Sequence, residues 1–386
     1  MRNPNRTSFQ AVLPFMLLNG STSDWTGIDG VINQMPKNYP KGKRKSVKPS
    51  SLRIGKGTKE SPNIFLLKML LSASPYYVSG SLLAERLKMS RVGVWSRIDK
   101  LRKVGLCIEA AQNRGYRLAG EPNQLNIHLL EAWLSENSQP CKVFLRESTD
   151  STNSEAERLL ANGNPAPFAV LANTQTQGRG RLGRSWHSPR DGNLYLSVAF
   201  RPDVDLIKLR SFTLWQGIRI CQLLGKVTEN SKLSVKWPND LFHQNLKFGG
   251  MLTEASIDCE RVKSLIFGFG LNLNASCKKF PNDLKEQATS LDEINGASLR
   301  IHEITAKIIK TVFSAYDDCL AGRVEKNLVA EWDKVDALAG KNIRITQGGD
   351  VIRGKACGID ADGGLKIKLR NGRLKTVRAG DVTLGK

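Results

Sequence analysis

The residues best suited to bind an anion lie in the segment 175–186, Gln-Thr-Gln-Gly-Arg-Gly-Arg-Leu-Gly-Arg-Ser-Trp, where three glycines alternate with three arginines. Glycine lets the backbone approach a ligand closely, and guanidinium groups match the oxygens of phosphates and carboxylates. One alternative is a flexible basic loop that binds RNA. The neighbouring segments 170–172 and 193–200 have the composition of strands, so we favour an anion-binding loop held between two strands.

Polar residues also stand at the ends of other expected strands. The turn 151–153, Ser-Thr-Asn, lies between a strand-like run and a helix expected at 154–161. Such a turn can hold a polar, anionic ligand group, although by itself it is also an ordinary helix N-cap. Lys236 ends another expected strand shortly before Pro238, which cannot continue a sheet. We therefore expect the Lys236 amine at the mouth of a site.

Overall composition is that of a soluble protein with room for two or three domains in its 386 residues. No apolar run approaches the ~18 residues needed to span a bilayer. The seven cysteines are scattered, without the spacing of a zinc site. This pattern predicts reduced thiols and a cytoplasmic protein without disulfide bonds or a metal site of its own.

The net charge of +22 is concentrated at the two ends of the chain. Residues 61–120 contain ten Lys and Arg but three Asp and Glu, whereas residues 121–339 contain 26 of each sign. Residues 340–386 are basic again, with eleven cations and four acids. A neutral body with basic ends is typical of an enzyme joined to a part that meets nucleic acid.

Residues 61–120 have the pattern of a winged helix-turn-helix. Three helices are expected, the second beginning after Ser79 and the third covering 91–103, followed by a hairpin of the strands 106–110 and 115–118. The third helix would enter the major groove, and Arg114 at the tip of the wing would contact phosphate or the minor groove. A small helical cap that does not bind DNA is the alternative. The expected DNA contacts are Arg91, Ser96, Arg97, Lys100 and Arg114.

The remaining segments complete a fold of the α+β class. Residues 1–60 are a basic extension that we expect to be disordered or to precede the true translation start. Residues 121–339 form a catalytic α/β domain whose first part, 121–130, is expected to be a linker. Glycine-rich turns divide residues 340–386 into four or five short strands, which predicts a small SH3-like barrel.

Four motifs occur in an order and at a spacing that resemble the biotin protein ligases, whose catalytic domain is similar to class II synthetases. They are Ser151-Thr-Asn, the glycine-arginine segment 175–186, Lys236-Trp-Pro-Asn-Asp, and Gly268-x-Gly-x-Asn272. The resemblance covers about residues 62–386. With the winged helix in front, the chain resembles the bifunctional members that also repress biotin genes.

The resemblance implies a role for each matching residue. The expected biotin contacts are Ser151, Thr152, Asn153, Gln175, Arg179, Gly180, Arg181 and Lys236. The expected ATP contacts are Arg181, Trp186, Lys236 and Asn272. Arg179, Arg181 and Lys236 would be the catalytic cations, because a carboxylate must attack a phosphorus atom that anionic oxygens surround.

Substrates and partners follow from the same resemblance. They are biotin, ATP with Mg²⁺, a biotin carboxyl carrier domain that presents the acceptor lysine, operator DNA, and a second copy of the chain when adenylate is bound. Membranes are not expected to be partners. Three other functions stay open: a lipoate-type ligase, a regulator that senses the adenylate without transferring it, and a ligase that does not repress.

Overall fold

The computed structural model describes residues 61–384 except 136–140, 191, 230–231 and 348. The expectations for residues 1–60 fall outside this part of the chain. None of the helices in the described part is long and apolar enough to cross a membrane.

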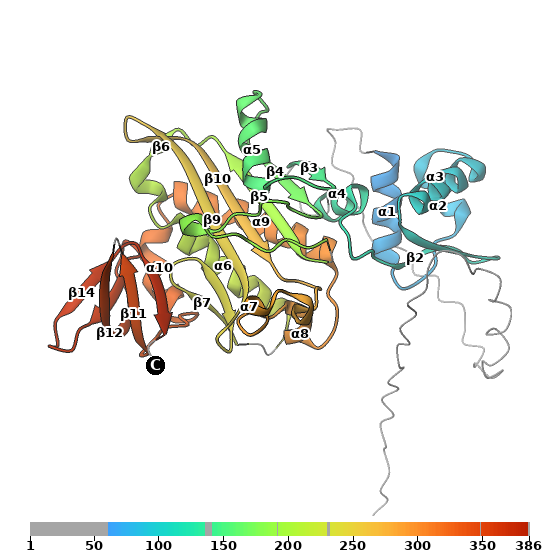
Figure 1. Ribbon diagram of the computed structural model, residues 1–386. Coiled ribbons are helices and arrows are strands. Elements are labelled where there is room, and N and C mark those ends of the chain that lie inside the picture. Colours follow the sequence, from blue (N-terminus) through green and yellow to red (C-terminus); the bar gives the residue numbers. More distant parts are fainter. Residues whose placement is uncertain (1–60, 136–140, 191, 230–231, 348, 385–386) are drawn as a thin grey trace, which may run out of the picture. The chain divides into compact units, whose positions relative to one another are not determined.

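Three helices and a hairpin form the N-terminal domain, as predicted (Figure 1). The elements are α1 (Pro62–Ala73), α2 (Gly80–Leu87), α3 (Arg91–Lys103), β1 (Cys107–Ala111) and β2 (Gly115–Gly120). The side chains of Ser79 and Ser90 accept hydrogen bonds from Leu82 N and Gly93 N, so both helices begin at a side-chain cap. A separate hydrophobic cluster of buried leucines and other apolar residues holds the domain together.

The expected linker at 121–130 is only partly a linker, because helix α4 (Ile127–Ser135) already begins at Ile127. Asn126 starts this helix: its side-chain oxygen accepts hydrogen bonds from His128 N and Leu129 N. Leu129 and Leu130 are fully buried, Leu129 in the hydrophobic cluster of the N-terminal domain and Leu130 in the main core. The sequence interpretation therefore missed a helix whose cap is an asparagine within a polar stretch.

An eight-stranded sheet is the centre of the catalytic domain, in the order β3-β4-β5-β10-β9-β8-β7 with β6 paired to β10. β3 and β4 are parallel and the other pairs are antiparallel. The strands are β3 (Lys142–Arg146), β4 (Phe168–Ala172), β5 (Leu194–Phe200), β6 (Val204–Asp205), β7 (Leu233–Lys236), β8 (Asp240–His243), β9 (Leu246–Asp258) and β10 (Arg261–Leu271).

Helices cover this sheet with apolar side chains. α6 (Phe212–Val227) and α9 (Ile301–Leu320) pack on each other within the main core, and α5 (Thr152–Ala161) packs on β4, β5 and β10 in a smaller cluster. A 3₁₀ turn at Leu206–Leu209 precedes α6. Helix α10 (Val324–Asp333) follows α9 along the chain. Two short helices follow β10, α7 (Asn282–Lys285) and α8 (Leu291–Asn295).

Five antiparallel strands form the C-terminal domain, in the order β14-β13-β12-β11-β15. They are β11 (Asn342–Gln347), β12 (Asp350–Ile359), β13 (Leu365–Lys368), β14 (Leu374–Val377) and β15 (Asp381–Leu384). Gly363 and Gly372 have φ angles of +83° and +80°, which explains the glycines at these turns. Trp237 Nε1 donates to the carbonyl of Gly363 over 3.0 Å, which ties this domain to the end of β7.

Candidate active site under the glycine-arginine loop

Two adjoining cavities lie beside the segment 175–186, which we call the glycine-arginine loop. The smaller, of about 120 Å³, is lined by all the predicted biotin contacts and by Trp186. The larger, of about 630 Å³, is lined by Trp186, Lys236 and Asn272. Ligand pockets usually measure about 300–1,000 Å³, so the smaller cavity is tight with the loop in this position. Residues far apart in the sequence thus meet as predicted.

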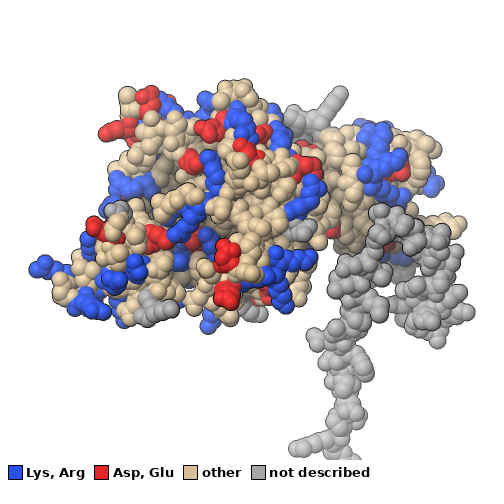
Figure 2. Space-filling view, viewed as in Figure 1, with Lys and Arg blue, Asp and Glu red and all other residues tan. Residues whose placement is uncertain are grey.

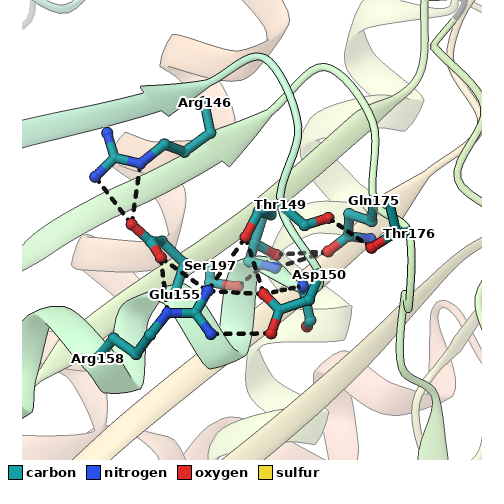
Figure 3. A network of polar contacts seen from close by, with 10 residues as sticks. Arg146, Thr149, Asp150, Glu155, Arg158, Gln175, Thr176 and Ser197 are labelled. Atoms are coloured by element: carbon teal, nitrogen blue, oxygen red, sulfur yellow. Dashed lines mark hydrogen bonds and ion pairs between the residues drawn. The ribbon is translucent and has the colours of Figure 1, made fainter.

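A closed hydrogen-bond network fixes the floor of the smaller cavity (Figure 3). Gln175 Oε1 accepts from Thr152 N at 2.8 Å, and Gln175 Nε2 donates to Ser188 Oγ at 2.9 Å. Ser197 Oγ lies 2.8 Å from Thr152 Oγ1 and 2.5 Å from Asn153 Oδ1. The sequence interpretation missed Ser197, a fully buried hydroxyl in the middle of the apolar strand β5.

A second network holds the turn 149–152 from behind (Figure 3). Both Asp150 carboxylate oxygens accept from the Arg158 guanidinium, at 2.7 and 2.9 Å. These hydrogen bonds hold the pKa of the Asp150 carboxyl well below its usual range. Asp150 also accepts from Ser151 N through its side chain and from Gln177 N through its carbonyl. The pair of Asp150 and Arg158 therefore positions both the turn and the start of the loop.

Each arginine of the loop is bound to a different element. Arg179 pairs with Glu254 of β9 at 2.9 Å. Arg181 donates to Asn239 Oδ1 at 3.1 Å, and burial lowers the pKa of its guanidinium. Arg184 pairs with Asp381 of β15 at 2.6 Å. The loop is therefore held to the sheet, to the segment after β7 and to the C-terminal domain.

Glu254 connects the loop to the floor of the smaller cavity. Its Oε2 atom accepts from Asn153 Nδ2 at 2.7 Å as well as from Arg179 at 2.9 Å. Two predicted biotin contacts from different elements thus share one carboxylate oxygen. No motif in the sequence identifies Glu254, because its partners lie 75 and 101 residues away.

Lys236 lies at the end of β7, as expected, and lines both cavities. Burial lowers the pKa of its amine, and the carboxylates of Asp240 and Asp381 partly oppose this shift. Asp240 itself pairs with Lys247 at 2.7 Å. The Lys236 amine also lies 5.1 Å from the centre of the Phe242 ring. A partly desolvated cation therefore stands where the cavities meet.

The two glycines of β10 explain how Asn153 and Trp186 reach their positions. A Cβ atom at Gly268 would lie 2.4 Å from Asn153 Oδ1, and one at Gly270 would lie 2.5 Å from Trp186 Cε2. The groups that approach this strand most closely at its two glycines are therefore the protein's own side chains. Trp186 Nε1 is buried and has no hydrogen-bond partner among the described residues.

Asn272 is buried, and its amide donates to the carbonyl of Thr289 at 3.1 Å. The predicted DNA contacts lie in the N-terminal domain, and none of them lines either cavity. Arg91, Lys100 and Arg114 are exposed there, whereas Arg97 is half-buried and donates to Asn63 Oδ1 at 3.0 Å.

Fold and cavities define a class of protein: a ligase-type catalytic domain between a winged helix-turn-helix and a small β domain. The Biotin/lipoate A/B protein ligase family model matches residues 145–272, an HTH domain matches 64–117, and the biotin protein ligase C-terminal domain matches 339–385. The chain belongs to the biotin protein ligases of the bifunctional ligase/repressor type.

Curated relatives and a solved structure support this assignment. The Bifunctional ligase/repressor BirA of Bacillus spizizenii is 31% identical, over 83% of this chain and 98% of the relative. The protein of that name from Escherichia coli is 28% identical over the same shares. The biotin protein ligase from Aquifex aeolicus in complex with biotin and ATP matches 64% of this chain and 99% of its own, with 30% identity and a TM-score of 0.54.

Proposed function

We propose that this protein is an ATP-dependent biotin protein ligase that also represses transcription. It would activate biotin as biotinyl-5'-AMP and transfer the biotinyl group to a lysine of a carboxylase carrier domain. One observation carries the proposal: the smaller cavity gathers every residue assigned to biotin, from three segments, beside a larger cavity that shares Lys236. The relatives named as ligases point to the same activity.

The residues suit the two half-reactions. In the first, the biotin carboxylate attacks the α-phosphorus of ATP and pyrophosphate leaves. Arg179, Arg181 and Lys236 would offset the repulsion between the two anions and stabilise the charge that develops on the phosphate oxygens. In the second, the acceptor amine attacks the acyl carbon and AMP leaves with the electron pair. Because the mixed anhydride is labile, the loop would protect it from water.

We assign biotin to the smaller cavity and the nucleotide to the larger. Trp186 and Lys236 border both, so the α-phosphate would lie beside them. Mg²⁺ usually binds through one or two carboxylates and substrate phosphates. Asp240 and Asp381 line both cavities and fit this requirement, and Mg²⁺ would neutralise phosphate charge there. The described residues contain no cluster of three or more acidic, histidine or cysteine ligands.

Transfer of labelled biotin to a purified carrier domain tests the ligase. We expect wild-type protein to label the acceptor lysine, and Lys236→Ala to abolish both adenylate formation and labelling. Lys263→Ala is the matched control, because this exposed lysine pairs with Asp203 outside the cavity linings. Adenylate without transfer would indicate a regulator, and preferred incorporation of lipoate would indicate a lipoate ligase.

The repressor function rests on the HTH domain and on relatives named ligase/repressor. We propose that adenylate orders the loop and favours a homodimer whose two third helices bind a palindromic operator, with contacts from Arg91, Ser96, Arg97, Lys100 and Arg114. Gel shifts on duplexes selected from a random library test this function. Absence of any specific shift with biotin and ATP would leave a ligase alone, and ligand-independent dimerisation would refute the coupling.

A further inference from the structure

Two apolar side chains stand on the outward face of α3. The inner face fixes the orientation of this helix, because Val94, Ile98 and Leu101 are at most 1% exposed. On the outward side, Val92 is 74% exposed and Trp95 is 54% exposed. Residues three apart in a helix share one face, so these side chains form one apolar surface near the start of α3.

Exposed cations lie on α3 and at the end of α2 in the same domain. Arg91 and Lys100 are exposed on α3 itself, and Arg86 and Lys88 are exposed at the end of α2. Figure 2 shows Lys and Arg side chains gathered over this domain, in agreement with the ten cations and three acids of residues 61–120. Such charge complements a polyanion, so the partner that fits the apolar surface is double-stranded DNA.

Several polar side chains of α3 are engaged within the domain. Arg97 donates to Asn63, and Asp99 forms an ion pair with Lys103 at 3.0 Å on the outward face. The Ser90 hydroxyl accepts from Gly93 N as the helix cap. Ser96, another predicted contact on α3, is half-buried. The exposed residues in the first two turns of this helix are Arg91, Val92 and Trp95.

We propose that Val92 and Trp95 recognise the methyl groups of thymine bases in the major groove of the operator. The proposal rests on the repressor function proposed above and names the base that the repressor would recognise. In a helix-turn-helix, the first residues of the recognition helix contact base edges. Thymine is the base that presents a methyl group in the major groove, where apolar side chains contact it. Contact with these methyl groups removes both apolar surfaces from water.

Replacing thymine by uracil removes the methyl group alone and so isolates this interaction. Full-length protein with biotin and ATP first selects duplexes from a random library, and the best duplex is then made with dU in place of dT. We expect the dU duplex to bind about fourfold more weakly for each contacted methyl group. Trp95→Ala and Val92→Ala should weaken binding to the dT duplex and reduce its preference over dU.

Lys100→Ala is the control. A lysine that contacts phosphate contributes equally to the affinity for the dT and dU duplexes and adds to the salt dependence of binding, so its removal should leave the preference for dT unchanged. Thermal unfolding should be unchanged in all three variants, whose altered side chains are exposed. Specific binding with equal affinities for dT and dU would overturn this inference and leave the repressor function intact. A Trp95→Ala variant that loses dimerisation but keeps the thymine preference would also overturn it. Failure to select any duplex would instead refute DNA binding itself.

Discussion

The glycines of β10 give the sharpest test of the two-cavity assignment. Gly268 lies directly against Asn153, which lines the smaller cavity. Gly270 lies directly against Trp186, which lines both cavities. Replacing either by alanine adds one methyl group at nearly the same place on one strand. We expect Gly268→Ala to impair biotin binding chiefly, whereas Gly270→Ala should impair the binding of both substrates, because Trp186 lines both cavities.

The size of the effect follows from the distances. Ordinary contact begins near 3.4 Å, so Asn153 Oδ1 or Trp186 Cε2 must move by about 1 Å from the 2.4 or 2.5 Å that the new Cβ would impose. Asn153 holds hydrogen bonds to Ser197 and Glu254, and each broken bond of a buried group costs about 1–3 kcal/mol. We therefore expect the KM for biotin to rise about 5- to 150-fold in Gly268→Ala.

Steady-state pyrophosphate release with each substrate varied in turn measures both KM values. Thermal unfolding accompanies it, because the new methyl groups could also destabilise β10. Equal rises of both KM values in Gly268→Ala, or a rise of the KM for ATP alone, would refute the assignment of biotin and nucleotide to separate cavities, because Asn153 lines only the smaller one. Gly225→Ala is a control, since a Cβ there meets nothing within 4 Å.

Two further variants test the contacts that hold the loop and the turn. Glu254→Gln removes the charge that Arg179 contacts. Because exposed ion pairs contribute about 0–1 kcal/mol, we expect biotin to dissociate up to about fivefold faster, without a change in the unfolding temperature. Unchanged dissociation of biotin would show that this contact does not hold the loop. Arg158→Gln releases Asp150 and should raise the KM for biotin more than it lowers kcat. An unchanged KM for biotin in this variant would contradict the role of the pair.

Local signals were sufficient to predict the helices of the winged domain and the positions of the glycine-arginine loop and Lys236, whereas the role of each site residue came from the resemblance to the biotin protein ligases. Ser79 and Ser90 mark helix starts by their own chemistry, and the glycine-arginine loop and Lys236 stand at strand ends. Glu254 and Ser197 were missed because they lie inside strands, where the sequence shows alternation but not the partner across the sheet. Arg158 was missed because an arginine on a short helix has the pattern of a solvated charge until the fold brings Asp150 against it.

The C-terminal domain can influence catalysis in two ways, through the loop or through the charge of Lys236. Arg184 and Asp381 form one ion pair, so breaking it from either side should release the loop equally. Their charges act oppositely on Lys236, since Asp381 raises the pKa of its amine and Arg184 lowers it. A rate that needs the Lys236 cation falls as pH rises through this pKa.

Asp381→Asn should therefore move the alkaline limit of adenylate formation to lower pH, and Arg184→Gln should move it to higher pH. Rates of adenylate formation, measured from neutral to alkaline pH for the two variants and wild type, distinguish an effect through the loop from an effect on the charge of Lys236. If the domain acts through the loop alone, the two profiles will coincide in shape, and both variants will lose biotin faster. Opposite shifts would show that β15 contributes a charge to the active site, because no change in loop position common to both variants can move one pKa in two directions.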